Sequence, residues 1–177
     1  MMNHQERKSR RSWMPPTIAA IAVTLLIGIV TSAGADNPMP ALPPDLFVTT
    51  PPPNAVGVGE ARRAAREGQP IVVRGRIGGM AKPIADKYAM FLLTDLNMEL
   101  CKDGCAAPCK VPKEQVLAGT ATVQVADSGG RPMKVSVEGR NGLRPLAEVV
   151  VKGTVGKLDQ NVMIINAQNI FVQDDKK

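Results

Sequence analysis

The sequence predicts an all-β protein: a small Greek-key barrel of five or six strands, with one short helix before it and a cysteine-bearing insertion within it. Near the C-terminus, β-branched runs at 149–155 and 162–172 flank a polar turn at 156–161, which is the pattern of a hairpin. Upstream segments alternate apolar and polar residues, as half-buried strands do. A glycine in the middle of one such segment is typical of a barrel corner.

Residues 1–35 have the organisation of a secretory signal peptide. Residues 1–11 are polar and basic, 18–30 are continuously apolar or small, and 33–35 read Ala-Gly-Ala. Because residues 17–35 approach the ~20 residues that a membrane-spanning helix needs, an uncleaved anchor is the alternative. Both interpretations predict that the rest of the chain is exported, to the periplasm or another extracytoplasmic space, either free or anchored to the membrane.

Export changes what the charge of the chain implies. Residues 1–35 hold four of the 22 Lys and Arg and one of the 16 Asp and Glu, so without them the net charge falls from +6 to +3. That charge is typical of a solvated surface rather than a nucleic-acid-binding one. The single histidine, His4, lies in the same segment. Without an imidazole for general-base catalysis or metal binding, we expect a non-enzymatic protein.

A linker and a helix are predicted before the barrel. Residues 36–56 are rich in proline and lack periodicity, which predicts an extended spacer. Within 57–69, residues 58–67 are strong helix formers and a glycine follows them. Arg62, Arg63 and Arg66 are expected on one face of this helix, either solvated or in contact with an anion.

The barrel is predicted over 70–173, followed by a polar tail at 174–177. Its first strand is 71–77, where Gly75 indicates a bend or a close backbone approach. The second strand is 88–95, with Phe91 as its aromatic core residue.

The insertion, 96–119, separates these two strands from the rest of the barrel. It contains the cysteines and ends in a helical turn at 113–118. A hairpin of 120–126 with 133–138 follows, before the C-terminal hairpin. The core-facing residues expected in it are Val123, Val125, Val135 and Val137.

Four segments resemble strands one, two, four and five of an OB-fold: VVRGRI, FLLTD, GLRPLAEVVVKGTV and NVMIINAQNIFV. The likeness covers 70–172 and is strongest to small exported bacterial OB proteins and to tRNA-anticodon-type nucleic-acid-binding OB domains. The chain departs from the pattern in its insertion and in the shortened segment 139–147 before strand four. The resemblance implies a binding face on the barrel. The residues expected on that face are Arg74, Arg76, Lys82, Lys87 and Tyr88.

Cys101, Cys105 and Cys109 allow three interpretations. An oxidising compartment favours one local disulfide with one thiol left over, and that thiol can also bridge to another molecule. A thiolate site for zinc or copper(I), with nearby Asp and Met ligands, is the second. Unpaired thiols without a role are the third. The spacing C-x3-C-x3-C matches no standard zinc or iron–sulfur pattern.

These observations predict an exported, non-enzymatic binding or interaction module whose ligand is a protein, a glycan or an anion such as a lipid headgroup. A metal-binding or redox-responsive protein built on the cysteine loop is the alternative. Binding of nucleic acid is a further alternative, which the sequence does not favour. Base stacking needs aromatic platforms, and the barrel offers only Tyr88, Phe91 and Phe171.

Overall fold

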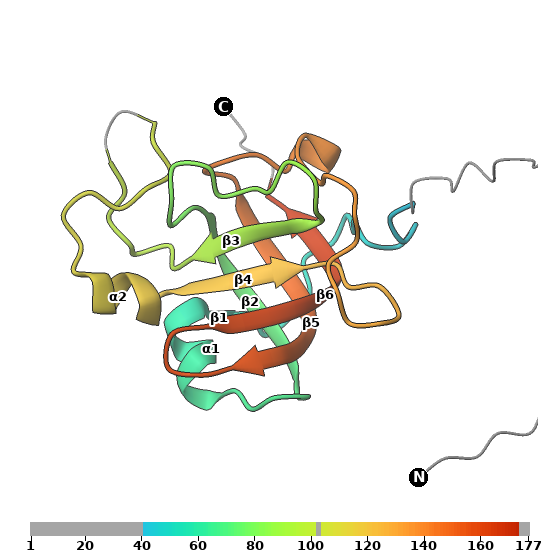
Figure 1. The fold of residues 1–177 in the computed structure, drawn as a ribbon, viewed down its shortest axis with the longest axis horizontal. Helices are drawn as coiled ribbons and strands as arrows, with labels where there is room; N and C mark the ends of the chain where they lie inside the picture. The colour runs from blue at the N-terminus through green and yellow to red at the C-terminus, as the bar shows by residue number, and fades with distance from the viewer. Residues whose placement is uncertain (1–40, 102–103, 174–177) are drawn as a thin grey trace, which may run out of the picture. The chain divides into compact units, whose positions relative to one another are not determined.

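The computed structural model describes residues 41–101 and 104–173, which form a closed five-stranded barrel with one additional short strand (Figure 1). The strands are β1 (Val56–Gly57), β2 (Pro70–Ile77), β3 (Met90–Thr94), β4 (Thr120–Gln124), β5 (Glu148–Leu158) and β6 (Met163–Val172). The helices are α1 (Val58–Ala64), α2 (Lys113–Ala118) and a 3-10 turn, η1 (Arg140–Gly142).

The strand order makes this barrel OB-like. β2 pairs antiparallel with β3 on one edge and with β5 on the other, and this double pairing closes the barrel. β3 pairs antiparallel with β4, β4 pairs parallel with β6, and β6 returns antiparallel to β5. The predicted Greek-key barrel is therefore confirmed, including its C-terminal hairpin.

Inward and outward residues alternate on each barrel strand, and the inward ones form one apolar core. Phe91 is 3% exposed, which confirms it as an aromatic core residue. Gly75 is buried where β2 crosses β3, and a Cβ atom there would lie 2.6 Å from the carbonyl oxygen of Thr94. The predicted close backbone approach at Gly75 is thus present, and it allows the barrel to bend tightly at this point.

Polar contacts attach α1 to the barrel. The two carboxylate oxygens of Asp95, after β3, accept hydrogen bonds from the backbone N–H groups of Val58 at 2.6 Å and Gly59 at 2.9 Å. Farther along the helix, Arg62 donates to the carbonyl oxygens of Thr120 at 2.7 Å and Asp159 at 3.3 Å. Partial burial lowers the pKa of Arg62, and attraction to Asp159 opposes that shift. The helix is therefore fixed at its start and along its length.

The single basic face predicted for the arginines is wrong. The helix ends at Ala64 rather than Glu67, so Arg66 lies beyond it, while Arg62 turns toward the barrel and Arg63 is exposed. The hydrogen bonds that Arg62 makes with two barrel carbonyls explain the difference, because they hold this side chain against the barrel rather than in solvent.

Part of the predicted linker belongs to the barrel. Leu46 is fully buried in the core. The N–H group of Ile170 donates to the carbonyl oxygen of Leu46, and the N–H group of Val48 donates back to Ile170. A short extended stretch thus lies along β6, because one leucine in the core and two backbone hydrogen bonds offset the cost of ordering it.

The second half of the predicted hairpin, residues 133–138, is not a strand. Beyond β4 the pairing continues only as an isolated bridge between Ala126 and Pro132, and the N–H group of Val135 then turns back onto the carbonyl oxygen of Met133. The second neighbour of β4 is β6 instead. Val135 and Val137 are nevertheless buried, so their core positions are confirmed.

The predicted signal peptide or anchor, 1–35, and the tail, 174–177, lie outside the described residues. Within the described ranges, no helix combines the length and the apolar character that crossing a membrane requires.

Candidate functional site

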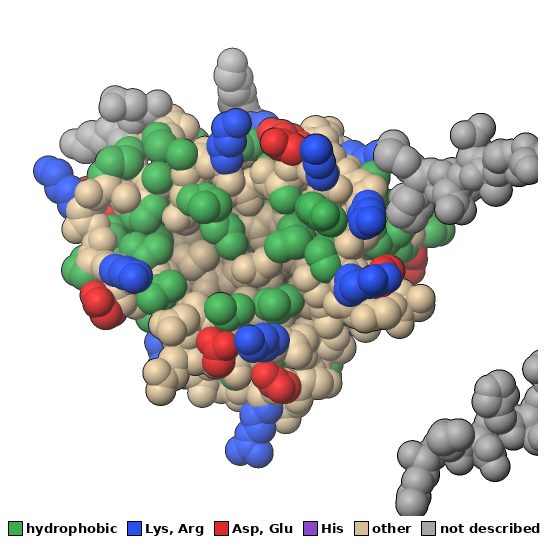
Figure 2. Space-filling view, viewed as in Figure 1, with side chains coloured by type: hydrophobic (Ala, Val, Ile, Leu, Met, Phe, Trp, Pro, Cys, Tyr) green, Lys and Arg blue, Asp and Glu red, His purple; other side chains and the backbone are tan. Residues whose placement is uncertain are grey.

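The outer face of β3, β4 and β6 carries an uncharged strip of side chains. Register places Leu92, Thr122 and Ile164 in one row across the three strands, and Met90, Gln124 and Asn166 in the next. We call these six residues the outer strip. Figure 1 shows β3 and β4 in front with β2 passing behind them, and Figure 2 shows that charged side chains surround this face while its centre is apolar or neutral.

Hydrogen bonding fixes the polar half of the outer strip. The side-chain amide of Gln124 donates to the Asn166 side-chain oxygen at 2.8 Å and to the carbonyl oxygen of Gly130 at 3.3 Å. Gln124 is 7% exposed, so this pair forms a rigid polar patch beside the apolar row.

Exposed apolar side chains border the outer strip at both ends. Met80 is 49% exposed, Tyr88 42% and Val162 36%, and these are the large apolar side chains exposed in the described part of the chain. Tyr88 lies just before β3, and Val162 directly precedes β6. Met80 follows Gly79, which lines a cavity of about 200 Å³ together with Val162 and Leu92. Apolar groups concentrated around one face are a common feature of interaction surfaces.

Tyr88 also borders a larger groove of about 580 Å³ with Met133 and Lys134. Asp127 anchors its far side: the N–H groups of Arg131 and Gly129 donate to Asp127 Oδ1 at 3.0 and 2.8 Å. The hydrogen bond from the Arg131 N–H group is the main cause that lowers the pKa of Asp127. The groove is partly apolar, through Tyr88 and Met133, and hydrogen bonds to Asp127 hold the loop 127–131 on one side of it.

The structure does not bring the five predicted binding residues together. Arg74 and Arg76, on β2, both pair with Glu148 of β5, at 3.2 and 3.3 Å. Arg76 lies opposite Thr94 of β3, which is not part of the outer strip. Thr94 is fully buried, and its hydroxyl lies 2.9 Å from the sulfur of Met98.

The other three predicted residues come from the loop between β2 and β3. Lys82 lines a separate cavity with Glu138. Lys87 and Tyr88 are both exposed, shortly before the start of β3. A contiguous basic face is thus absent among these five residues.

Sequence reasoning missed the outer strip itself. The sequence does contain a signal for it: Leu92 lies between two core residues, Phe91 and Leu93. Because side chains alternate along a strand, an apolar residue in that position must point outward.

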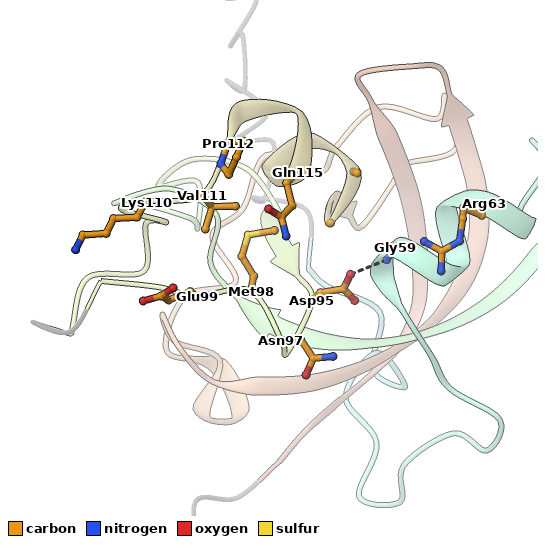
Figure 3. A pocket seen from close by; sticks show the side chains of 12 residues that line it. Gly59, Arg63, Asp95, Asn97, Met98, Glu99, Lys110, Val111, Pro112 and Gln115 are labelled. Atoms are coloured by element: carbon orange, nitrogen blue, oxygen red, sulfur yellow. Dashed lines mark hydrogen bonds between the residues drawn. The ribbon is translucent and has the colours of Figure 1, made fainter.

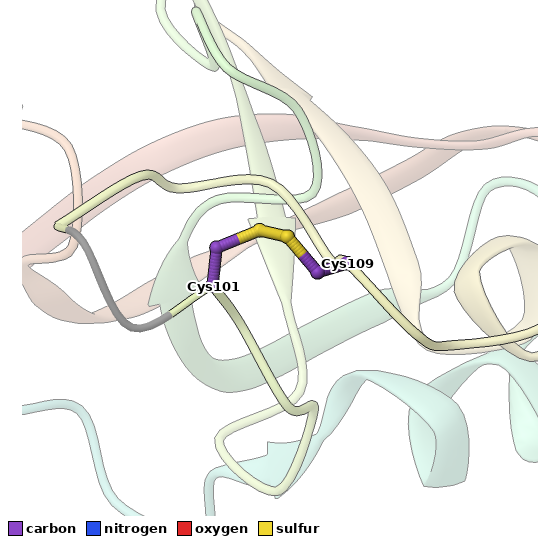
Figure 4. The surroundings of a disulfide bond; sticks show 2 residues. All are labelled: Cys101 and Cys109. Carbon is purple, nitrogen blue, oxygen red and sulfur yellow. A yellow bond between two sulfur atoms is a disulfide. The ribbon is translucent and has the colours of Figure 1, made fainter.

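The cysteines form one disulfide, Cys101–Cys109 (Figure 4). Cys105 is left free and half-buried. The interpretation of one local disulfide with one leftover thiol is confirmed. Two of the three sulfurs are therefore unavailable as thiolate ligands, and within the described ranges no cluster of three His, Cys, Asp or Glu side chains could hold a metal ion.

No protein-family model matches this chain, and no curated protein matches it. Among solved structures, the chain is similar to the hypothetical protein ygiW from E. coli, with 18% identity and a TM-score of 0.37 over 71% of this chain and 97% of that one. The OB-like fold of this chain rests on its own strand order and register.

Proposed function

We propose that the protein is an exported, non-enzymatic binding module and that its outer strip binds a weakly charged segment of a partner protein. One observation carries this proposal: the exposed large apolar side chains of the described residues lie next to this face. Val162 lines one cavity with Leu92 of the outer strip, Met80 follows Gly79 of that cavity, and Tyr88 lies just before β3. Water-exposed apolar groups of this kind become favourable when a partner covers them.

The chemistry of the outer strip supports a polypeptide over the other ligands considered. Leu92 and Ile164 offer apolar contact, while the hydroxyl of Thr122 and the side-chain NH2 group of Asn166 can bond backbone groups. Met and Tyr, which border the strip, are enriched in protein interfaces. A nucleic acid would need cations along this face, and two of the cations predicted for it, Arg74 and Arg76, pair with Glu148 instead.

Export is proposed from two observations. Residues 1–35 have the pattern of a signal peptide. The Cys101–Cys109 disulfide is compatible with an oxidising, extracytoplasmic compartment.

Position-specific photo-crosslinking in the native compartment tests the binding face. A photoreactive amino acid is placed at Thr122, in the outer strip, or at Lys152, an exposed position on β5. We expect a discrete protein adduct from position 122, and we expect that adduct to disappear when Ile164→Asp is added. Adducts of equal yield from both positions, or no adduct from position 122, would contradict the proposal. Thermal melts of each variant confirm that it is folded.

A further inference from the structure

Another cavity, of about 440 Å³, lies between α1, α2 and the segment after β3 (Figure 3). It is separate from the cavity of about 200 Å³ beside the outer strip, because different residues of α2 line the two. Val116 and Leu117 line the cavity beside the strip, and Gln115 and Ala118 line this one. Its volume falls in the range of small-molecule sites.

The floor of this cavity is apolar and rigid. Met98 is 9% exposed, and the hydroxyl of Thr94 lies 2.9 Å from its sulfur. The N–H group of Asp95 donates to the carbonyl oxygen of Gly119 at 2.9 Å, which ties the two sides of the floor together. Val111 and Ala118 complete the apolar lining.

The charges around the cavity are unequally engaged. Asp95 is occupied, because each of its oxygens accepts a backbone hydrogen bond from the start of α1. Three more charged residues line the cavity: Arg63, Glu99 and Lys110. None of them forms an ion pair or hydrogen bond with the residues that the structure describes. Figure 3 shows Arg63 on the α1 side, Glu99 on the opposite side, and Gln115 projecting between them from α2. Within the described part of the chain, the cavity therefore offers two free cations, Arg63 and Lys110, one free anion, Glu99, and the neutral amide of Gln115.

We propose that this cavity binds a short zwitterionic peptide of two or three residues, with its terminal carboxylate on Arg63 and its terminal ammonium on Glu99. The guanidinium fork matches a carboxylate, which accepts two parallel hydrogen bonds from it. Gln115 can both donate to and accept from the peptide group between the termini. The apolar floor of Met98, Val111 and Ala118 suits small apolar side chains.

Titration calorimetry of the full, oxidised chain with trialanine tests this site. We expect saturable binding to trialanine and none to trialanine blocked at both termini. Arg63→Gln and Glu99→Gln should each weaken binding about tenfold, the effect of losing one charge-assisted contact worth ~1.4 kcal/mol. The matched controls Arg66→Gln and Glu114→Gln remove exposed charges outside the cavity and should leave the affinity unchanged.

The two charges can be assigned by pairing each variant with one blocked peptide. Arg63→Gln should no longer distinguish trialanine from its C-terminal amide, and Glu99→Gln should no longer distinguish it from its N-acetyl form. Absence of binding to free trialanine, equal binding of the doubly blocked peptide, or equal weakening by the control variants would overturn the proposal. The comparison of free with doubly blocked trialanine uses the wild-type protein only, so it remains decisive even if a variant fails to fold.

Discussion

Arg62 Nη2 lies 2.7 Å from the carbonyl oxygen of Thr120, at the start of β4. The same guanidinium donates to the carbonyl oxygen of Asp159, in the turn between β5 and β6. One side chain of α1 thus connects the helix to two barrel segments far apart in the sequence. Val162, which borders the outer strip, lies in that same turn, so this contact also positions the proposed binding face.

Replacing Arg62 with Met should destabilise the protein. The change keeps an apolar stem but leaves the carbonyl oxygens of Thr120 and Asp159 without this donor, at a cost of about 1–3 kcal/mol in the free energy of unfolding. Urea unfolding followed by circular dichroism measures the loss. The control Arg66→Met, at an exposed position beyond the helix, should change the free energy of unfolding by less than about 0.5 kcal/mol. Equal effects of the two changes would show that the contact contributes nothing.

The Cys101–Cys109 disulfide should stabilise the fold by restricting the unfolded chain. The two residues are 8 apart in sequence, for which loop-closure entropy gives about 2.5 kcal/mol. Replacing both cysteines with serine should lower the unfolding midpoint in urea accordingly, whereas Cys105→Ser should have a smaller effect. Intact mass after alkylation without reduction should show one blocked thiol. Three blocked thiols in protein from its native compartment would refute the disulfide.

Leu46 should behave as a barrel residue rather than as part of a linker. Leu46→Ala removes a fully buried side chain from the core, which should cost about 2–5 kcal/mol. The neighbouring change Thr50→Ala, at an exposed position, provides the comparison. Thermal unfolding of the two variants should differ clearly, and similar melting temperatures would mean that the 46–48 stretch is not packed on β6.

The turn between β5 and β6 should respond to acid through Asp159. Hydrogen bonds from the N–H groups of Asn161 and Val162, followed by the contact with Lys157, lower the pKa of Asp159. A carboxylate whose pKa is lowered on folding contributes stability above its unfolded pKa of about 3.9 and loses it as the pH falls through its folded value.

Stability of the wild type and of Asp159→Asn should therefore converge as the pH falls from 7 to about 2. Urea unfolding at several pH values measures the difference. A difference that stays constant, or that grows in acid, would show that the charge of Asp159 does not stabilise the turn.

Local patterns in the sequence were sufficient to predict the barrel strands but not every element. The C-terminal hairpin and Gly75 could be predicted because alternation and glycine placement are local signals of strand geometry. The alternating Val135 and Val137 suggested a strand, yet their segment is irregular. Both side chains reach the core without ladder pairing, and sequence alternation cannot distinguish these two cases.

The candidate sites depend on contacts that local patterns do not encode. Arg74 and Arg76 looked like a basic face, but Glu148, more than 70 positions later, pairs with both. The peptide cavity brings together Arg63, Glu99 and Gln115 from three separate segments. Likewise, three cysteines permit three pairings, and composition alone does not select one of them.

The affinity of the outer strip for its partner tests the central claim most directly. With the protein crosslinked from position 122 identified and purified, its dissociation constant is measured for the wild type, for Ile164→Asp and for Lys152→Asp. We predict that Ile164→Asp weakens binding at least about tenfold, since a buried unpaired carboxylate costs more than 1.4 kcal/mol, while Lys152→Asp leaves it within about twofold. Equal affinities for Ile164→Asp and the wild type would contradict the assignment of this face as the binding surface.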